Sequence, residues 1–239
     1  MLEASGLQVK IGERTILRDV SFSAEKGECI GLIGPNGSGK STLIRTLCGL
    51  IPAAQGAVTA NGKNIASFRS NQLAKYIGYV PQDTTIDFDF LVKDMVLMGR
   101  HAHIPRFGTE SAGDYQAAQQ AMERTGIEHL ADRPVTRLSG GQRQMVFIAK
   151  VLAQQPSIYL FDEPVSALDI NRQLQVLELI RSLSDEGALT ITAIHDLNLA
   201  ARYCDRLFLM QDGQIIAAGT PEEVLTSSTV QAAYCVLSV

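Results

Sequence analysis

The stretch GPNGSGKS, residues 34–41, has the residue types and the spacing of a phosphate-binding loop. It fits G-x-x-x-x-G-K-[ST], in which glycines let the backbone curl until several N–H groups face one anion. Lys40 would reach the β and γ phosphates of a nucleotide, and Ser41 would bind Mg²⁺. The apolar run CIGLI precedes the stretch and the amphipathic run STLIRTLCGL leads on from it. Because this strand–loop–helix context points the loop amides at phosphate, the sequence predicts a nucleoside triphosphate site.

Two acidic residues, Asp162 and Glu163, end the apolar run SIYLF and are followed by Pro164. An open α/β sheet binds its ligands at the carboxyl ends of its strands. Asp162 is therefore a candidate Mg²⁺ ligand, acting through water. Pro164 biases Glu163 away from helical backbone angles. This could direct the Glu163 carboxylate toward the γ phosphate, where it could orient or deprotonate the attacking water.

Two further polar residues follow apolar runs. His195 comes after LTITAI, and Gln82 comes after YIGYVP. By the same positional rule, His195 could contact the γ phosphate and respond to its loss, although a lone histidine in such a place can also be structural. Gln82 could contact Mg²⁺ or the attacking water. Both residues are therefore candidates for the catalytic set.

The stretch LSGGQRQ, residues 138–144, predicts a helix start in which Ser139 caps the backbone and Gln142 closes a capping box. A cap requires neither Gly140 nor Gly141, and each glycine costs up to about 1 kcal/mol relative to alanine in a helix. We therefore expect that bare backbone is needed here for another contact.

The elements that would position these residues form an α/β fold with a mostly parallel sheet. Apolar runs at 29–33, 77–80, 157–161, 189–194 and 206–210 predict strands, and helical patterns alternate with them. Asn61-Gly62 and Asp212-Gly213 predict hairpins with type I′ turns, so antiparallel strands would flank the parallel core. Residues 83–156 show hardly any strand signal, which predicts a helical subdomain inserted into one domain spanning residues 1–239.

The segment that leads into this helical region is rich in apolar residues, namely Phe88, Phe90, Leu91, Val92 and Met95. Two interpretations of them remain open. These side chains could pack in a local core, or they could form a docking surface for a partner.

Composition and charge restrict the classes of partner. Lys and Arg number 21 against 25 Asp and Glu, a net charge of −4, so we expect no general attraction to nucleic acid or anionic lipid. The start has no basic region followed by an apolar core, and no apolar run approaches the roughly 18 to 20 residues that cross a bilayer. These features predict a cytosolic chain that meets a membrane only through a partner.

Cysteines and histidines give no strong metal signal. Cys29, Cys48, Cys204 and Cys235 are widely separated, which predicts buried, reduced thiols rather than a zinc site or a redox pair. His101 and His103 could be half of a metal site, but no cysteine or carboxylate stands close beside them in the sequence.

Taken together, GPNGSGKS, Gln82, LSGGQ, IYLFDE, SALD (residues 166–169) and His195 occur in the order and approximate spacing found in the nucleotide-binding subunits of ATP-binding cassette (ABC) transporters. The chain resembles that family over nearly its whole length. The resemblance implies a P-loop NTPase core, ATP hydrolysis, and ATP and Mg²⁺ as cofactors. It implies catalytic roles for Glu163, His195 and Gln82, Mg²⁺ binding by Ser41, Gln82 and Asp162, and ATP binding by Gly34, Asn36, Gly37, Ser38, Gly39, Lys40, Ser41, Thr42, Ser139, Gly140, Gly141 and Gln142.

In that family, LSGGQ contacts the ATP held by a second subunit. The resemblance therefore implies a homodimer that sandwiches two ATP molecules head to tail, with SALD at the seam. Ser139 and the backbone of Gly140 and Gly141 would contact the γ phosphate bound by the other subunit's Lys40, in keeping with the anion affinity of a helix start. Members commonly stack an aromatic residue on adenine where this chain has Ile11, which can pack against a base but lacks the aromatic face.

Within the family, FDFLVKDMVLMGRH and the single-domain architecture most resemble importer subunits for metal chelates such as iron siderophores, haem or cobalamin. This implies an integral membrane permease as partner, an extracytoplasmic substrate-binding protein in the full system, and a peripheral location on the cytoplasmic face of the membrane. The alternatives are a soluble ABC-type ATPase of an assembly system such as iron–sulfur cluster biogenesis, an ATP-binding switch without useful turnover, and an exporter module. Lys40, Glu163 and Ser139 argue against a pure switch.

Overall fold

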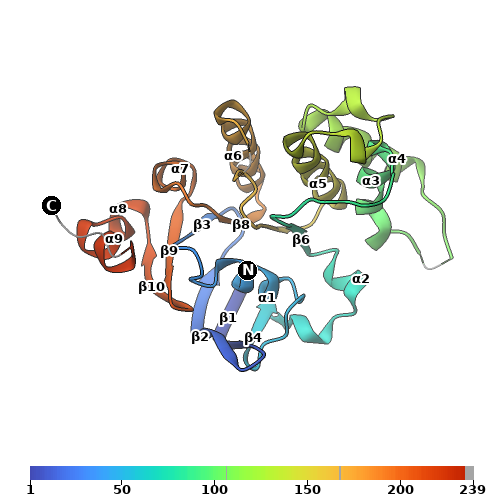
Figure 1. The fold of residues 1–239 in the computed structure, drawn as a ribbon. Coiled ribbons are helices and arrows are strands. Elements are labelled where there is room, and N and C mark those ends of the chain that lie inside the picture. The colour runs from blue at the N-terminus through green and yellow to red at the C-terminus, as the bar shows by residue number, and fades with distance from the viewer. Residues whose placement is uncertain (106, 167, 235–239) are drawn as a thin grey trace.

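A computed structural model of the chain describes residues 1–105, 107–166 and 168–234 (Figure 1). Two sheets form the core, a four-stranded one in the order β2-β1-β4-β5 and a six-stranded one in the order β10-β9-β3-β8-β7-β6. The second sheet is parallel from β9 to β6 and carries β10 antiparallel at its edge. The strands are β1 (Leu2–Ile11), β2 (Arg14–Ala24), β3 (Cys29–Ile33), β4 (Gln55–Ala60), β5 (Lys63–Asn64), β6 (Ile77–Val80), β7 (Ile158–Phe161), β8 (Leu189–Ala193), β9 (Arg206–Gln211) and β10 (Gln214–Gly219).

Helices cover the sheets and fill the long connection between β6 and β7. They are α1 (Lys40–Leu47), η1 (Ile65–Ser67), α2 (Ser70–Leu73), α3 (Val92–Leu97), η2 (Met98–Ala102), α4 (Ala112–Arg124), η3 (Glu128–Leu130), η4 (Val135–Arg137), α5 (Gly140–Gln154), α6 (Ile170–Asp185), α7 (Leu197–Tyr203), α8 (Pro221–Val224) and α9 (Ser227–Tyr234). The predicted α/β fold with a mostly parallel sheet and flanking antiparallel strands is confirmed. The division of the chain into a core and a helical subdomain at residues 83–156 stays a prediction.

Both predicted hairpins form with the expected turns. Asn61 and Gly62 have φ angles of 50° and 74°, and Asp212 and Gly213 have φ angles of 48° and 81°. Two positive φ values in succession are what a type I′ turn requires. A third hairpin, between β1 and β2, was not predicted. Register shifts along β1 interrupt its strict alternation of buried and exposed residues, which weakens the strand signal in the sequence.

The six-stranded sheet separates two hydrophobic cores. Successive residues of a strand face opposite sides, so Ile30 and Leu32 of β3 join the core with β1, β2 and α1, while Ile33 joins the core with α5, α6 and α7. The run CIGLI is buried along its full length, as expected for a parallel strand covered on both faces. This burial fixes the strand ends that carry the candidate site.

The C-terminal end of α5 is tied to the segment around η2. Arg100 Nε donates to Asp114 Oδ1 at 2.9 Å, and Arg100 Nη1 donates to the Ala153 carbonyl at 2.7 Å. His103 Nε2 lies 2.8 Å from the Gln154 carbonyl oxygen, so this histidine has a local partner at the helix end. Cationic and donor groups satisfy the free carbonyls of a helix C-terminus. In the part of the chain that the structure describes, no three His, Cys, Asp or Glu side chains are grouped as a metal site requires.

Gly99 lies where η2 crosses α5. A Cβ at this position would stand 2.1 Å from the carbonyl oxygen of Lys150, which is helix backbone and cannot move without shifting α5. We expect Gly99→Ala to lower the free energy of unfolding by about 1 to 3 kcal/mol, the typical cost of overpacking. Urea denaturation measures this difference. Gly113→Ala is the matched control, because its Cβ would meet Ser111 Oγ at an ordinary 3.6 Å. Equal midpoints for the two variants would show that the helix contact yields freely.

The cysteines differ from the prediction at one position. Cys29 and Cys204 are buried and free, whereas Cys48 is free but only partly buried, so the prediction of burial is wrong for Cys48. Burial of its thiol group nevertheless raises the pKa of Cys48 to about 11. Cys235 lies outside the described residues. Among the described helices, none combines the length and the apolar character that a membrane span requires.

Candidate active site

The loop between β3 and α1 presses its backbone against neighbouring strands. A Cβ on Gly34 would stand 2.1 Å from the carbonyl oxygen of Met210, so only glycine fits there. Lys40 begins α1 and is 4% exposed; its Nζ donates to the carbonyl oxygens of Gly34 at 2.8 Å and Pro35 at 3.1 Å. Burial lowers the pKa of Lys40, and the carboxylates of Glu163 and Asp162 oppose that shift. A cation is therefore held at the loop beside free N–H groups of a helix start.

A cavity of about 280 Å³ opens over this loop. Its lining residues are Ile16, Asn36, Gly37, Gly39, Lys40, Ser41, Thr42 and Glu163. The structure thus brings most of the predicted loop residues together with the predicted base. Ser38 is buried inside the loop, and its hydroxyl has no hydrogen-bond partner among the residues that the structure describes. A buried hydroxyl without a partner is costly, so it indicates a ligand oxygen at this place.

Ile11, which occupies the position of the family's adenine-stacking residue, is not among the residues that line the cavity. Ile11 is half exposed at the end of β1, whereas Ile16, on β2, lines the cavity. Sequence reasoning missed Ile16 because it missed the β1–β2 hairpin, and only that hairpin brings Ile16 to the loop. Its side chain offers an apolar contact without an aromatic face.

Asp162 is fully buried at the end of β7, where the parallel pairing with β6 and β8 places it. Its Oδ1 accepts the Ser41 hydroxyl at 2.7 Å. Burial raises the pKa of Asp162, while the hydrogen bond from Ser41 and the charge of Arg45 lower it. A hydroxyl beside a carboxylate is a hard-oxygen pair that suits Mg²⁺, which takes its remaining ligands from water and phosphate. The residues present therefore fit the predicted nucleotide with Mg²⁺.

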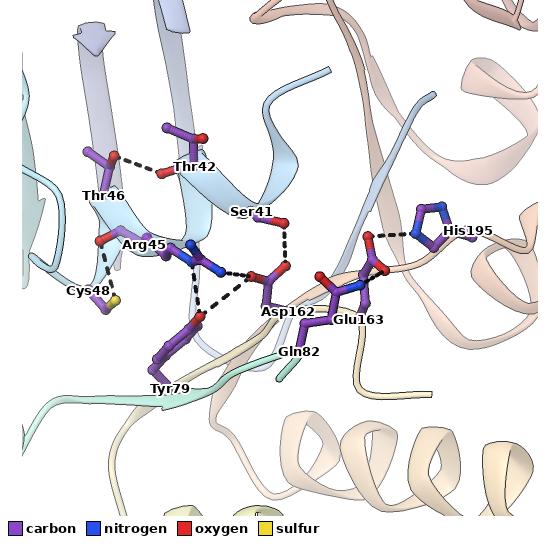
Figure 2. A network of polar contacts seen from close by, with 10 residues as sticks. All are labelled: Ser41, Thr42, Arg45, Thr46, Cys48, Tyr79, Gln82, Asp162, Glu163 and His195. Atoms are coloured by element: carbon purple, nitrogen blue, oxygen red, sulfur yellow. Dashed lines mark hydrogen bonds and ion pairs between the residues drawn. The ribbon is translucent and has the colours of Figure 1, made fainter. Parts of the chain in front are cut away.

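Glu163 is held between the other two predicted catalytic residues (Figure 2). Its Oε1 lies 2.6 Å from His195 Nε2, and its Oε2 accepts from Gln82 Nε2 at 2.6 Å. Because a carboxylate only accepts, the first contact requires a proton on His195 Nε2. Glu163 also has a φ of 51°, an unusual value for a residue other than glycine. Strained backbone of this kind gathers at functional sites, where surrounding contacts enforce it.

The helix start at LSGGQ forms as predicted but lies apart from the Lys40 cavity. Gln142 N–H donates to Ser139 Oγ at 3.3 Å and Ser139 N–H donates to Gln142 Oε1 at 3.1 Å, so the capping box is confirmed. A Cβ on Gly141 would approach Leu168 and Arg172 at 3.1 Å. A Cβ on Gly140 would meet no atom of the described residues within 4 Å. Nothing within the described chain therefore requires glycine at residue 140.

The SALD segment follows Glu163 and precedes α6. Ser166 Oγ donates to the Glu163 carbonyl at 3.1 Å, and Asp169 caps α6 through the Arg172 N–H at 3.0 Å. Ala167, the second residue of the segment, lies outside the described residues. The described part of SALD thus joins the strained turn at Glu163 to the helix that packs beside Gly141.

A groove of about 440 Å³ lies between α2 and α5, away from the Lys40 cavity. Its lining includes Cys48, Leu50, Leu73, Tyr79, Phe147 and Lys150.

The apolar side chains of the segment after Gln82 divide into buried and exposed ones. Val92 and Met95 are buried in the core, whereas Phe88 is 71% exposed and Phe90 is 39% exposed. The prediction of core packing is thus confirmed for Val92 and Met95, whereas the exposed side chains of Phe88 and Phe90 are accessible to a partner.

Comparison with known proteins shows what the chain is similar to. A family model described as ABC transporter matches residues 17–166. The cobalamin import ATP-binding protein BtuD of Halobacterium salinarum is 45% identical over 98% of this chain and 58% of the relative. The ferric enterobactin transport ATP-binding protein FepC of Escherichia coli is 41% identical over 98% of this chain and 86% of the relative. The chain thus spans little more than half the length of the Halobacterium relative.

Two solved structures share the fold. A metal-chelate type ABC transporter in an inward-facing conformation has a TM-score of 0.84 and 32% identity, covering 98% of this chain and 88% of that one. The dimeric structure of a bacterial ABC transporter cassette has a TM-score of 0.83 and 27% identity, covering 92% of this chain and 99% of that one.

Proposed function

The chain belongs to the ABC transporter family, and from that premise we propose that it is the ATP-hydrolysing subunit of an importer that takes up a metal chelate. The observation that carries the proposed activity is the position of Glu163. Its carboxylate lines the cavity over the phosphate loop and contacts His195 through one oxygen and Gln82 through the other. The cargo class rests on relatives named for cobalamin and ferric enterobactin, and on a solved transporter of metal-chelate type.

The proposed chemistry divides the tasks among the groups of the site, and Gln82 serves both the metal and Glu163. The loop amides and Lys40 hold the phosphates at the start of α1, where Asn36, Ser38 and Thr42 add contacts. Ser41 and Asp162, with Gln82, would hold Mg²⁺, which supplies positive charge to the β and γ phosphates when bound. Glu163 takes the proton of the attacking water. His195 and Gln82 fix the carboxylate of Glu163 and respond to the γ phosphate.

The proposed assembly is a homodimer with two composite sites. Gly140 has open space where a side chain would be, which supports an outside occupant at the start of α5. A phosphate held by a second copy suits this helix start, since the backbone N–H groups of Gly140 and Gly141 lie in its first turn, where a helix carries partial positive charge, while the capping box uses those of Ser139 and Gln142. The likeness to a dimeric cassette also supports this arrangement.

The proposed membrane partner is a separate permease whose cytoplasmic helix fits the groove between α2 and α5. The groove offers an apolar wall, with Leu50 and Phe147, beside the charge of Lys150. Such binding would hold the chain on the cytoplasmic face of the membrane. An extracytoplasmic protein would deliver the chelate to the permease. A soluble assembly ATPase is disfavoured, because both relatives named above serve import or transport.

The experiment that tests this function is purification of the tagged chain from its own membranes in mild detergent, with partners identified by mass spectrometry. We expect a polytopic permease in equal copy number, or two fused halves per pair of chains. Leu50→Asp should lose this permease while the ATPase activity of the isolated chain is kept, because Leu50 is exposed in the groove. Ile216→Asp changes an exposed apolar residue on β10 and should keep the permease. Recovery of a soluble partner alone would contradict the importer.

A further inference from the structure

A second group of side chains reaches the buried carboxylate of Asp162 through its other oxygen (Figure 2). The first oxygen, Oδ1, accepts the hydrogen bond from the Ser41 hydroxyl. Oδ2 lies 3.5 Å from the Tyr79 hydroxyl and 3.7 Å from Arg45 Nη2. Arg45 Nε donates to the Tyr79 hydroxyl at 3.3 Å. Tyr79, Arg45 and Asp162 therefore form a triangle in which each side chain contacts the other two.

Chemistry fixes the direction of the hydrogen bonds in this triangle. Arginine only donates, and an ionised carboxylate only accepts. The Tyr79 hydroxyl can do both, so it accepts from Arg45 and donates its proton to Asp162 Oδ2. The carboxylate is consequently held at both oxygens. Rotation away from Ser41 would break the contacts on Oδ2.

The triangle joins three elements that the sequence keeps far apart. Tyr79 belongs to β6, Arg45 belongs to α1, and Asp162 follows β7. The pairing of Tyr79 with Leu160 sets the β6 register that brings the phenol to the acid. Three residues after Tyr79, Gln82 holds Glu163 in the same way. One strand and its extension thus supply a partner to each of two consecutive acidic residues.

Neither Tyr79 nor Arg45 is among the residues that line the Lys40 cavity, so neither is placed to touch nucleotide. Building on the proposed function, we infer that both are positioning residues for the metal site, which hold the Asp162 carboxylate in the orientation that Mg²⁺ requires. Partners of this kind fix the orientation of metal-binding carboxylates and typically change metal affinity when they are removed. A carboxylate that is already oriented loses less freedom when the metal binds.

The test measures how strongly Mg²⁺ improves nucleotide binding. A non-hydrolysable β,γ-imido analogue of ATP is titrated into the full chain by calorimetry, once with Mg²⁺ and once with excess EDTA. Tyr79→Phe removes the hydroxyl and keeps the ring. We expect its affinity with Mg²⁺ to fall about fivefold, the scale of one lost hydrogen bond. Its affinity in EDTA and its melting temperature should match those of the wild-type chain. Tyr76→Phe, in the same segment, is the matched control and should change neither affinity.

Arg45→Gln gives a second, independent variant. Arg45 is 44% exposed, so the fold does not depend on its burial, and the same selective loss with Mg²⁺ is expected. The double variant should lose less than the product of the two single losses, because both changes break one triangle. The electron paramagnetic resonance spectrum of Mn²⁺ bound with the analogue should differ between Tyr79→Phe and the wild-type chain, since the orientation of a ligand has changed.

The outcomes separate this inference from the proposed function. Wild-type dependence on Mg²⁺ in both Tyr79→Phe and Arg45→Gln would overturn the inference and leave the ATPase intact. Equal losses with Mg²⁺ and with EDTA would also overturn it, because they would show a general structural role. A wild-type chain that binds no analogue even with Mg²⁺ would overturn the proposed function itself, and the inference with it.

Discussion

Glu163→Gln is expected to bind ATP with Mg²⁺ and to release phosphate at least about 100-fold more slowly than the wild-type chain, since a general base contributes a factor of about 10² to 10⁴. Glutamine has almost the same shape and can still contact Gln82 and His195, but its amide cannot take the proton of water. The loop around Lys40 is unchanged, so ATP binding should persist. With hydrolysis blocked, the ATP-bound dimer should accumulate.

Phosphate release at saturating ATP measures the rate, and size-exclusion chromatography with ATP measures the dimer. Glu186→Gln is the matched control, because Glu186 pairs with Arg124 on the surface at 2.7 Å. That variant should keep the wild-type rate and should form no stable dimer. A wild-type rate in Glu163→Gln would remove Glu163 from the role of base.

A mixture of two variants that are each inactive should recover part of the wild-type ATP hydrolysis. Lys40→Met removes the cation at the phosphate loop, and Gly140→Asp places a negative charge at the start of α5. Each variant alone should lose nearly all activity, because every homodimeric site contains the defect. In an equal mixture, random pairing leaves about a quarter of all sites with wild-type residues on both sides. We therefore expect about a quarter of the wild-type rate.

The Gly140→Asp chain should fold normally, which makes this test specific. A Cβ at Gly140 would meet no atom of the described residues within 4 Å, and an acidic residue in the first turn of a helix is stabilising. Thermal unfolding of each variant checks this point. A full rate for Gly140→Asp alone would contradict the contact with a partner's phosphate. No recovery in mixtures that contain mixed dimers would contradict composite sites that work independently.

The parts of the fold that follow from short-range signals could be predicted from the sequence. CIGLI and IGYV are uninterrupted apolar runs bounded by turn residues, and β3 and β6 match them residue for residue. Asn61-Gly62 and Asp212-Gly213 are local turn signals that need no tertiary information. The rule that ligand groups follow parallel strands also placed Gln82, Glu163 and His195 at one edge of the sheet, where the structure brings them into contact.

Contacts that depend on register and crossing geometry could not be predicted. Tyr79 reads as one more apolar residue of a buried strand, and only the pairing of β6 with β7 directs its hydroxyl at Asp162. Ile16 enters the nucleotide cavity through a hairpin whose strand signal is interrupted by register shifts. Gly99 carries no turn signal, because its requirement arises from the crossing of η2 over α5.

The open space at Gly140 has a consequence for the energy metabolism of the cell. On the proposed dimer, one chain carries two halves of a hydrolytic centre that cannot meet each other. A newly made subunit, diluted among other proteins, would therefore leave the ATP pool untouched. Consumption would begin where a permease gathers two copies, so fuel use would follow the number of assembled transporters rather than the amount of this subunit.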